Sequence, residues 1–447
     1  MQHTDKNTSI TQKHKLFWLE ISQHINRKAY IFVFLFVFSF SMLFAFYTQH
    51  AWEDWYITYR ISKNLATGNG LVYTIGQKVQ AFTSPIGTLI PALLNIITFN
   101  SSDDLVLWLF RFINCIVLGL TSISLLKIAH FSKFYFGTTL LLIGLFAVDT
   151  KIVDFSINGM ETAYMVFFLI SFCYLLIVEN HSLTFLLGLV WAGLMYTRPD
   201  SCVYILCLII GILIFNPKHK YIKNRLHWIK TFIFSGLICA VLYLPWFFWT
   251  WHYFGSPIPH TIVAKGLLMS YDPIAILKFL IKFPYTMFIG VTSIDATFMP
   301  PYYCNGWGNI HIIGKIITLF TALYWLVPSK KFRIARVLSF TVLLIHSYLM
   351  YVTFGSFGWI APWYLPSVAI LSIFVLAFGV QQLSEFTLSK STNYKLLGLG
   401  DIALSSIVTN RFRSCLQFFI IAILSFTLTI TILSAYSLKI QQNIIEN

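Results

Sequence analysis

The sequence predicts an all-α polytopic membrane protein. Of its 447 residues, 57% are hydrophobic and only 11% are charged, which is not the composition of a water-soluble domain of this size. Apolar runs long enough to cross a bilayer recur along the chain. The net charge of +15 comes from bases in short blocks between these runs, as in the cytoplasmic loops of membrane proteins, so nucleic-acid binding is not predicted.

The first apolar run covers residues 30–47 and follows several bases, among them Arg27 and Lys28. No A-x-A-like cleavage site follows this run. We therefore predict an uncleaved first helix rather than a removed signal peptide.

Together with this first run, the segments that can cross a bilayer give about eleven transmembrane helices. A helix of about 20 residues spans the hydrocarbon core, and shorter ones are tolerated when tilted. The segments after the first lie at roughly 105–127, 135–150, 162–178, 183–197, 202–215, 231–251, 310–327, 337–354, 365–380 and 416–436.

Two further apolar segments, 85–99 and 273–291, are ambiguous. The first contains Pro91, and the second carries Lys278 and Lys282 at helical spacing. The basic loops of the chain all face the cytoplasm only if neither segment crosses. We therefore predict that both are helices at the outer interface and that the C-terminus is outside. These basic loops are 127–133, 216–230, 328–336 and 381–415.

With this topology, most acidic residues lie outside or at the outer membrane edge. Acidic residues contribute little to the orientation of a chain in the membrane, so the positive-inside rule does not explain their excess on the outer side. The sequence therefore predicts chemistry on the outer face of the membrane.

The strongest candidate is the acidic pair Glu53 and Asp54, directly after the first helix. Ionisable groups at a membrane edge are functional candidates because they are costly there. Ile57 and Arg60 follow at helical spacing, which indicates a short amphipathic helix on the membrane. We predict a general base that takes a proton from an acceptor hydroxyl, the alternative being a solvated helix cap.

Thr83 and Ser84 precede Pro85 at the start of the second interfacial segment. They are predicted to frame a substrate pocket, the alternative being an N-cap before proline. The glycines at 68, 70 and 76 permit tight turns, but their spacing does not match a phosphate-binding motif.

Two later outer loops carry further charges. Glu161 lies in N-G-M-E-T, where it is either a second acid of the site or a charge that complements a helix dipole. Arg198 and Asp200 lie in R-P-D, where the arginine either clamps an oxyanion or only pairs with its neighbour.

The loop F-G-S-P-I-P-H-T, residues 254–261, is stiffened by prolines and contains His260. Lys265 follows it near the predicted headgroup level, where it is placed for a lipid-linked phosphate. The alternative for Lys265 is a lysine that extends to the interface.

No metal site is predicted, because the spacing of His50, Glu53 and Asp54 matches no recognised ligand pattern. A divalent cation stays open as a cofactor. The tryptophans and tyrosines near helix ends, including Trp249, Trp251, Trp363 and Tyr364, are predicted to be mostly interfacial belt residues.

Several of these motifs resemble a known family. The stretch 53–85, E-D-W-Y-I-T-Y-R through A-F-T-S-P, resembles the first outer loop of bacterial GT-C glycosyltransferases that use polyprenyl-phosphate sugars. It resembles especially relatives of the mycobacterial terminal arabinofuranosyltransferase. N-G-M-E-T-A, T-R-P-D and F-G-S-P-I-P-H-T-I-V-A-K resemble that family's later motifs in the same order, so the resemblance covers about residues 30–270.

The resemblance implies a GT-C transmembrane core over residues 1–270, with a catalytic first periplasmic loop at 48–104. Residues 271–447 are then a variable C-terminal transmembrane region without a separate soluble domain. The family's catalytic base corresponds to Asp54, or to Glu53 if the pairing shifts by one. The expected donor-phosphate ligands are Lys265, Arg198, Arg60 and His260, and the expected substrate-binding residues are Thr83, Ser84, Glu161 and Asp200.

The chain departs from the family at three places. Gln80 stands where an acid is usual, an aromatic-glycine step is missing near Ala81-Phe82, and Trp363 replaces an arginine before Y-L-x-P. The last change removes an expected phosphate contact, so Lys265 or Arg198 has to contribute more.

The predicted function is inverting transfer of a sugar from a polyprenyl-phosphate donor to an envelope glycan or lipid. The enzyme is expected in the bacterial inner membrane, with its site facing the periplasm. The alternatives are a lipid or sugar transporter or flippase, and an O-antigen-type polymerase or ligase.

Overall fold

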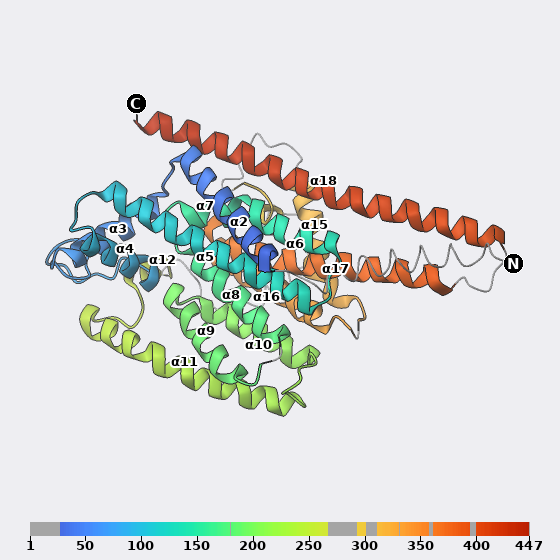
Figure 1. Ribbon diagram of the computed structural model, residues 1–447. Coiled ribbons are helices and arrows are strands. Elements are labelled where there is room, and N and C mark those ends of the chain that lie inside the picture. The colour runs from blue at the N-terminus through green and yellow to red at the C-terminus, as the bar shows by residue number, and fades with distance from the viewer. Residues whose placement is uncertain are drawn as a thin grey trace.

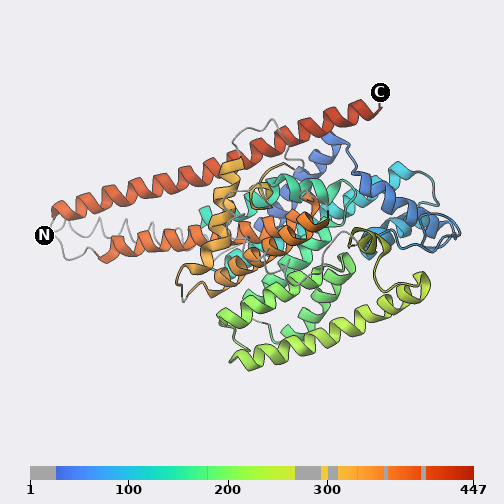
Figure 2. The same ribbon diagram turned by 180° about the vertical axis from the view of Figure 1, so that it is seen from behind.

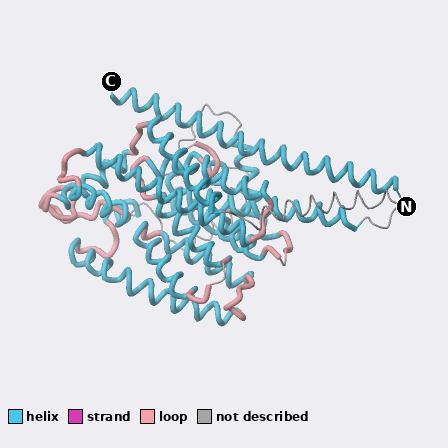
Figure 3. The backbone as a smooth tube through the Cα atoms, viewed as in Figure 1, coloured by secondary structure: helices cyan, strands magenta, loops and turns pink. Residues whose placement is uncertain are grey.

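The computed structural model describes residues 27–178, 180–266, 293–300, 311–329, 331–356, 361–393 and 399–446. These residues form helices joined by turns and loops, and no β-strand occurs among them (Figure 3). The predicted interfacial segment 273–291 lies outside the described residues.

Six helices of the described chain are long and apolar enough to cross a membrane. The protein is therefore an all-α polytopic membrane protein, as predicted. The helices that contain these segments are α2 (Arg27–Thr48), α5 (Asp103–Phe131), α11 (Arg225–Phe254), α16 (Arg333–Ser356), α17 (Leu365–Asn393) and α18 (Leu399–Glu446).

Shorter apolar helices account for the remaining predicted spans. Each predicted segment overlaps one helix, and the ambiguous segment 85–99 corresponds to α4. The number of crossings stays a prediction, because the short helices fall below about 20 residues. These helices are α4 (Pro85–Ile97), α6 (Phe136–Val148), α8 (Thr162–Ile177), α9 (Leu183–Thr197), α10 (Ser201–Phe215) and α15 (His311–Leu323), with η2 (Tyr324–Leu326) after it.

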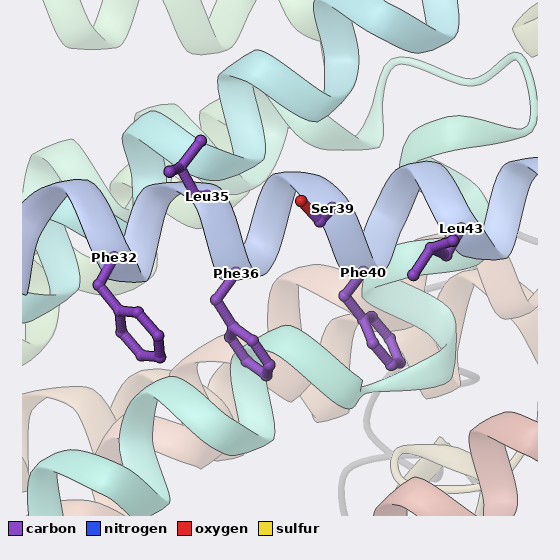
Figure 4. Close-up of a pocket in the computed structure, with 6 residues that line it drawn as sticks. All are labelled: Phe32, Leu35, Phe36, Ser39, Phe40 and Leu43. Atoms are coloured by element: carbon purple, nitrogen blue, oxygen red, sulfur yellow. The ribbon is translucent and has the colours of Figure 1, made fainter.

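Helix α17 lies at the centre of the bundle and is buried along most of its described length. Helices α2, α11 and α18 lie at the periphery and expose many large apolar side chains (Figures 1 and 2). Such an apolar exterior is what a bilayer solvates. On α2 an open crevice of about 320 Å³ is lined by Phe32, Leu35, Phe36, Ser39, Phe40 and Leu43 (Figure 4).

Helix α3 (Glu53–Ala66) and α4 lie together at one end of the bundle, beside the start of α5 (Figure 1). The amphipathic pattern explains this placement, because Trp55 and Tyr59 are buried while Arg60 is exposed. The Tyr59 hydroxyl lies 3.0 Å from Asn95 Oδ1 and 2.8 Å from Asp103 Oδ1. It therefore ties α3 to both neighbouring helices.

The sequence did not predict α7 (Thr150–Ile157), an eight-residue helix in which every residue is buried. The predicted span 135–150 ends early because Asp149 breaks the helix and accepts a hydrogen bond from the Ile152 N–H at 3.0 Å. Asp149 and Asp154 are both buried in the protein interior. Helix α7 leads directly into the turn that carries Glu161.

His50, in the loop between α2 and α3, gives stability a predictable pH dependence. Burial, and next the guanidinium of Arg111, lower the pKa of His50 to about 4. The unfolded chain takes up this proton near pH 6.5, but the folded chain takes it up only near pH 4. The contribution of neutral His50 to the free energy of unfolding is therefore fully present above pH 6.5. About 3 kcal/mol of it is lost as the pH falls from 6.5 to about 4.

The His50→Gln variant should lack this contribution. We expect the melting temperature of the parent to fall more steeply than that of the variant between pH 7 and pH 4.5. Parallel pH profiles for the two proteins would contradict the account.

Candidate active site

The start of α3 is fixed against the turn at residues 158–161. The Trp52 N–H donates to the Asn158 carbonyl at 3.1 Å. Gly159 adopts a φ of +97°, and a Cβ at this glycine would lie 2.6 Å from Cβ of Trp55. The N-G-M-E turn therefore packs directly on α3 and brings Glu161 close to Asp54.

Gly159 provides a prediction about this packing. Gly159→Ala should lower stability by about 1–3 kcal/mol, because it adds a steric clash to an unfavourable positive φ. Gly76→Ala is the matched control, since Gly76 has a φ of +85° and a Cβ at this glycine would meet nothing within 4 Å. Melting temperatures of both variants test this, and an equal loss would show that the contact with Trp55 is unimportant.

Arg198 connects the ends of three helices at this turn. Its Nη1 lies 3.3 Å from Oε1 of Glu161, just before α8. Its Nε lies 3.0 Å from Oδ1 of Asp200, and its Nη2 lies 3.4 Å from Oδ2 of the same carboxylate. The local Arg198–Asp200 pair expected from the sequence thus exists, and it extends across the bundle to Glu161.

A tyrosine completes this cluster. The guanidinium carbon of Arg198 lies 4.5 Å from the ring centroid of Tyr364, at the end of η3 (Pro362–Tyr364). The side chains of Arg198 and Glu161 are each only 11% exposed, so solvent screens their interaction weakly. Two carboxylates and a ring face therefore hold the guanidinium in one orientation.

The environment shifts the pKa values of both partners. Burial alone would lower the pKa of Arg198, but Asp200 and then Tyr364 and Glu161 raise it well above its usual value. Burial raises the pKa of Glu161, Arg198 opposes this shift, and the charges of Asp54 and Asp200 add to it. Asp54 therefore acts electrostatically on the same carboxyl that pairs with Arg198.

The two acids of the first loop differ in their surroundings. Asp54 is half-buried in the first turn of α3, whereas Glu53 is exposed. Glu161 and Asp200 pair with the guanidinium of Arg198, and the charge of Asp54 acts on Glu161, so this part of the site is acidic. Of the two acids, Asp54 is the one that the structure associates with the cluster.

Ser84 also lies at this site, with a structural role. It caps α4, because its Oγ accepts a hydrogen bond from the Gly87 N–H at 2.9 Å. A Cβ at Gly87 would lie 3.5 Å from Cβ of Glu161, so the N-terminus of α4 borders the cluster. Thr83, the preceding residue, is half-buried.

The predicted donor-phosphate residues do not all join this cluster. His260, at the start of α12 (His260–Gly266), accepts a hydrogen bond at Nδ1 from the Gln80 N–H at 3.2 Å. Its neutral ring therefore carries a proton on Nε2 and can donate it. Arg60 is exposed and lies 4.6 Å from the ring centroid of Tyr73. The side chain of Lys265 lies outside the described residues.

Sequence reasoning assigned Tyr364 to the interfacial belt and missed its contact with Arg198. The signal was its place in W-Y-L-P, residues 363–366, next to the position where the family resemblance expects an arginine. Within the described residues, no three His, Cys, Asp or Glu side chains form a group suited to a metal ion.

The chain is similar to one characterised enzyme. No protein family's sequence profile matches the chain. It is 26% identical over 242 residues to a terminal β-(1→2)-arabinofuranosyltransferase of Corynebacterium glutamicum. The match covers 48% of this chain and 33% of the corynebacterial protein, so the chain spans about a third of that relative's length. The similarity agrees with the glycosyltransferase class that the motifs resemble.

Proposed function

We propose that the protein is a membrane glycosyltransferase of the GT-C type, with a polyprenyl-phosphate sugar as donor. The observation that supports this most is that Asp54 lies beside the Glu161–Arg198–Asp200 cluster. A carboxylate base next to an anchored guanidinium is what glycosyl transfer from a phosphate requires. The similarity to an arabinofuranosyltransferase supports the same class.

In the proposed reaction, Asp54 takes the proton of an acceptor hydroxyl. The hydroxyl oxygen forms a bond to the anomeric carbon from the face opposite the phosphate. The bond between this carbon and the phosphate oxygen breaks, and polyprenyl phosphate leaves with the electron pair. The configuration at the anomeric carbon is therefore inverted.

Cationic and N–H groups at the site stabilise the phosphate. Arg198 has five N–H donors, and its bonds to Glu161 and Asp200 account for three of them. His260, on α12 and outside the Arg198 cluster, is the second proposed donor through its Nε2–H, and Lys265 lies on the same helix. With charge held there, phosphate leaves without a separate general acid.

The donor's apolar tail places the reaction at a membrane surface. We assign the site to the periplasmic side of a bacterial inner membrane, with an envelope glycan or lipid as acceptor. This assignment rests on the distribution of basic loops and outer acids in the sequence.

An assay with purified protein distinguishes this function from its alternatives. The protein is incubated with polyprenyl-phosphate-linked pentoses and hexoses and with glycans extracted from the host envelope. We expect release of polyprenyl phosphate and a matching gain of one sugar on the glycan, detected by mass spectrometry. A transporter or flippase leaves every donor bond intact, and that result would refute the proposal.

A further inference from the structure

A second surface lies beside the acidic cluster and has the opposite charge. The turn at residues 67–82 contains one lysine and no acid, and the segment 255–264 contains no acid either. Lys78 is exposed, and its Nζ lies 4.9 Å from the ring centroid of Tyr253, near the end of α11. Positive charge is thus held on an aromatic ring at the outer end of the bundle.

Tyr253 belongs to a row of rings on one face of α11. Trp246 and Trp249 have ring centroids 5.3 Å apart, and Trp249 stacks on Tyr253 at 5.1 Å with an interplanar angle of 15°. The spacings of three and four residues place these rings on one side of the helix. We call these three rings, together with Lys78 over the last of them, the ring row: Trp246, Trp249, Tyr253 and Lys78.

The ring row faces the first loop and continues to the candidate active site. Phe82 lies 6.5 Å from Trp246, and a Cβ at Gly70 would lie 2.6 Å from the Tyr253 hydroxyl oxygen. At the other end, the ring of Tyr196 lies 6.2 Å from that of Trp246. Tyr196 precedes Arg198 by two residues, so the row leads from the Arg198 cluster toward Lys78.

The opposite face of α11 provides a natural comparison. The ring of Trp251 contacts those of Phe247 and Phe248, both outside the ring row. Trp249 is 44% exposed and Trp251 is 46% exposed. The two tryptophans are therefore about equally accessible, but Trp249 stacks on Tyr253, the ring that carries Lys78, whereas Trp251 contacts Phe247 and Phe248.

We propose that the ring row binds an anionic sugar unit of the acceptor glycan, a proposal that rests on the proposed function. Trp249 is exposed, and Trp246 and Tyr253 are half-buried. Such rings offer rigid, amphipathic contact area at low entropic cost, which suits the flat face of a sugar ring. The ammonium of Lys78 pairs with a carboxylate or phosphate on that sugar. The acidic cluster around Asp54 then meets the hydroxyl that reacts.

The test measures binding without catalysis. Tetrasaccharides of equal length that carry carboxylates, phosphate monoesters or no charge are titrated onto the full-length protein in detergent, and binding is followed by saturation-transfer NMR. We expect a charged tetrasaccharide to bind about tenfold more tightly than the neutral one at low salt, and the preference to shrink as salt screens it. The two charged ligands show which anion is preferred.

Variants then locate the binding surface. Trp249→Ala should weaken binding of the charged ligand about tenfold, whereas Trp251→Ala should leave it unchanged. Lys78→Gln should remove the preference for charge but retain neutral binding. Equal effects of the two tryptophan variants, or equal binding of neutral and charged ligands by the parent, would overturn the proposal.

A second readout separates this inference from the proposed function. Donor cleavage by the parent protein, with and without a glycan acceptor, is measured separately from glycan binding. If transfer occurs and Trp249→Ala binds acceptor normally, the ring-row proposal fails while the transferase stands. If the ring row binds glycans as expected but no donor is ever cleaved, the transferase proposal fails instead.

Discussion

Replacing Asp54 with asparagine should lower the rate of sugar transfer by about 10²- to 10⁴-fold, the usual contribution of a general base. The amide has nearly the same shape as the carboxylate but cannot accept the acceptor's proton. Folding should persist, because Asp54 is only half-buried. Transfer rates at saturating donor and melting temperatures of parent and variant measure the two effects.

Glu53→Gln is the matched control for this prediction. It removes an equal charge from the neighbouring residue, which is exposed. We expect it to retain most of the activity. If Glu53→Gln were the inactive variant and Asp54→Asn active, the base would be Glu53, which is the other assignment that the family resemblance allows.

Arg198→Ala should destabilise the protein by about 3–5 kcal/mol, as removal of one partner from a buried ion pair does. The variant leaves Glu161 and Asp200 without their cation. It should also lose transfer activity, because the guanidinium that we propose as a ligand of the phosphate is gone. Chemical denaturation in detergent micelles and transfer rates test both effects.

The Arg60→Ala variant is the control that distinguishes the effect of the Arg198 ion pairs from the effect of a cation–ring contact. Arg60 lies 4.6 Å from the centroid of Tyr73, and Arg198 lies 4.5 Å from that of Tyr364, so the cation–ring geometry is closely matched. Arg60 is exposed, and we expect its removal to cost less than about 1 kcal/mol. If Arg198→Ala and Arg60→Ala lowered the free energy of unfolding by similar amounts, the pairing of Arg198 with buried carboxylates would not be what stabilises the protein.

The helices of this protein were predictable because apolar length and helical periodicity are local properties. The amphipathic pattern after the first span identified α3, and Pro85 with Ser84 identified the start of α4. The acids and bases near helix ends also stood out, since few charges occur in the chain. These signals give the list of site residues but not their pairing.

Contacts between distant segments were beyond sequence reasoning. Glu161 and Arg198 are separated by a whole helix pair, and the packing of α8 against α9 brings them together. In the sequence, Tyr364 cannot be distinguished from a tyrosine of the interfacial belt, whereas in the structure its ring contacts the guanidinium of Arg198. Helix α7 was missed because its lysine and its one acid suggest a loop. In the structure, Lys151 donates to backbone carbonyls of Thr297 and Met299 in the interior.

The side of the membrane on which Asp54 lies tests the central claim most directly. In a cysteine-free background, Glu53→Cys and Lys220→Cys place thiols at exposed positions in the first loop and in the predicted cytoplasmic loop 216–230. A membrane-impermeant maleimide should label position 53 in intact cells from which any outer barrier has been removed, and position 220 only after lysis. Labelling of position 220 alone in those cells would place the acidic cluster in the cytoplasm, away from a periplasmic donor, and contradict the account.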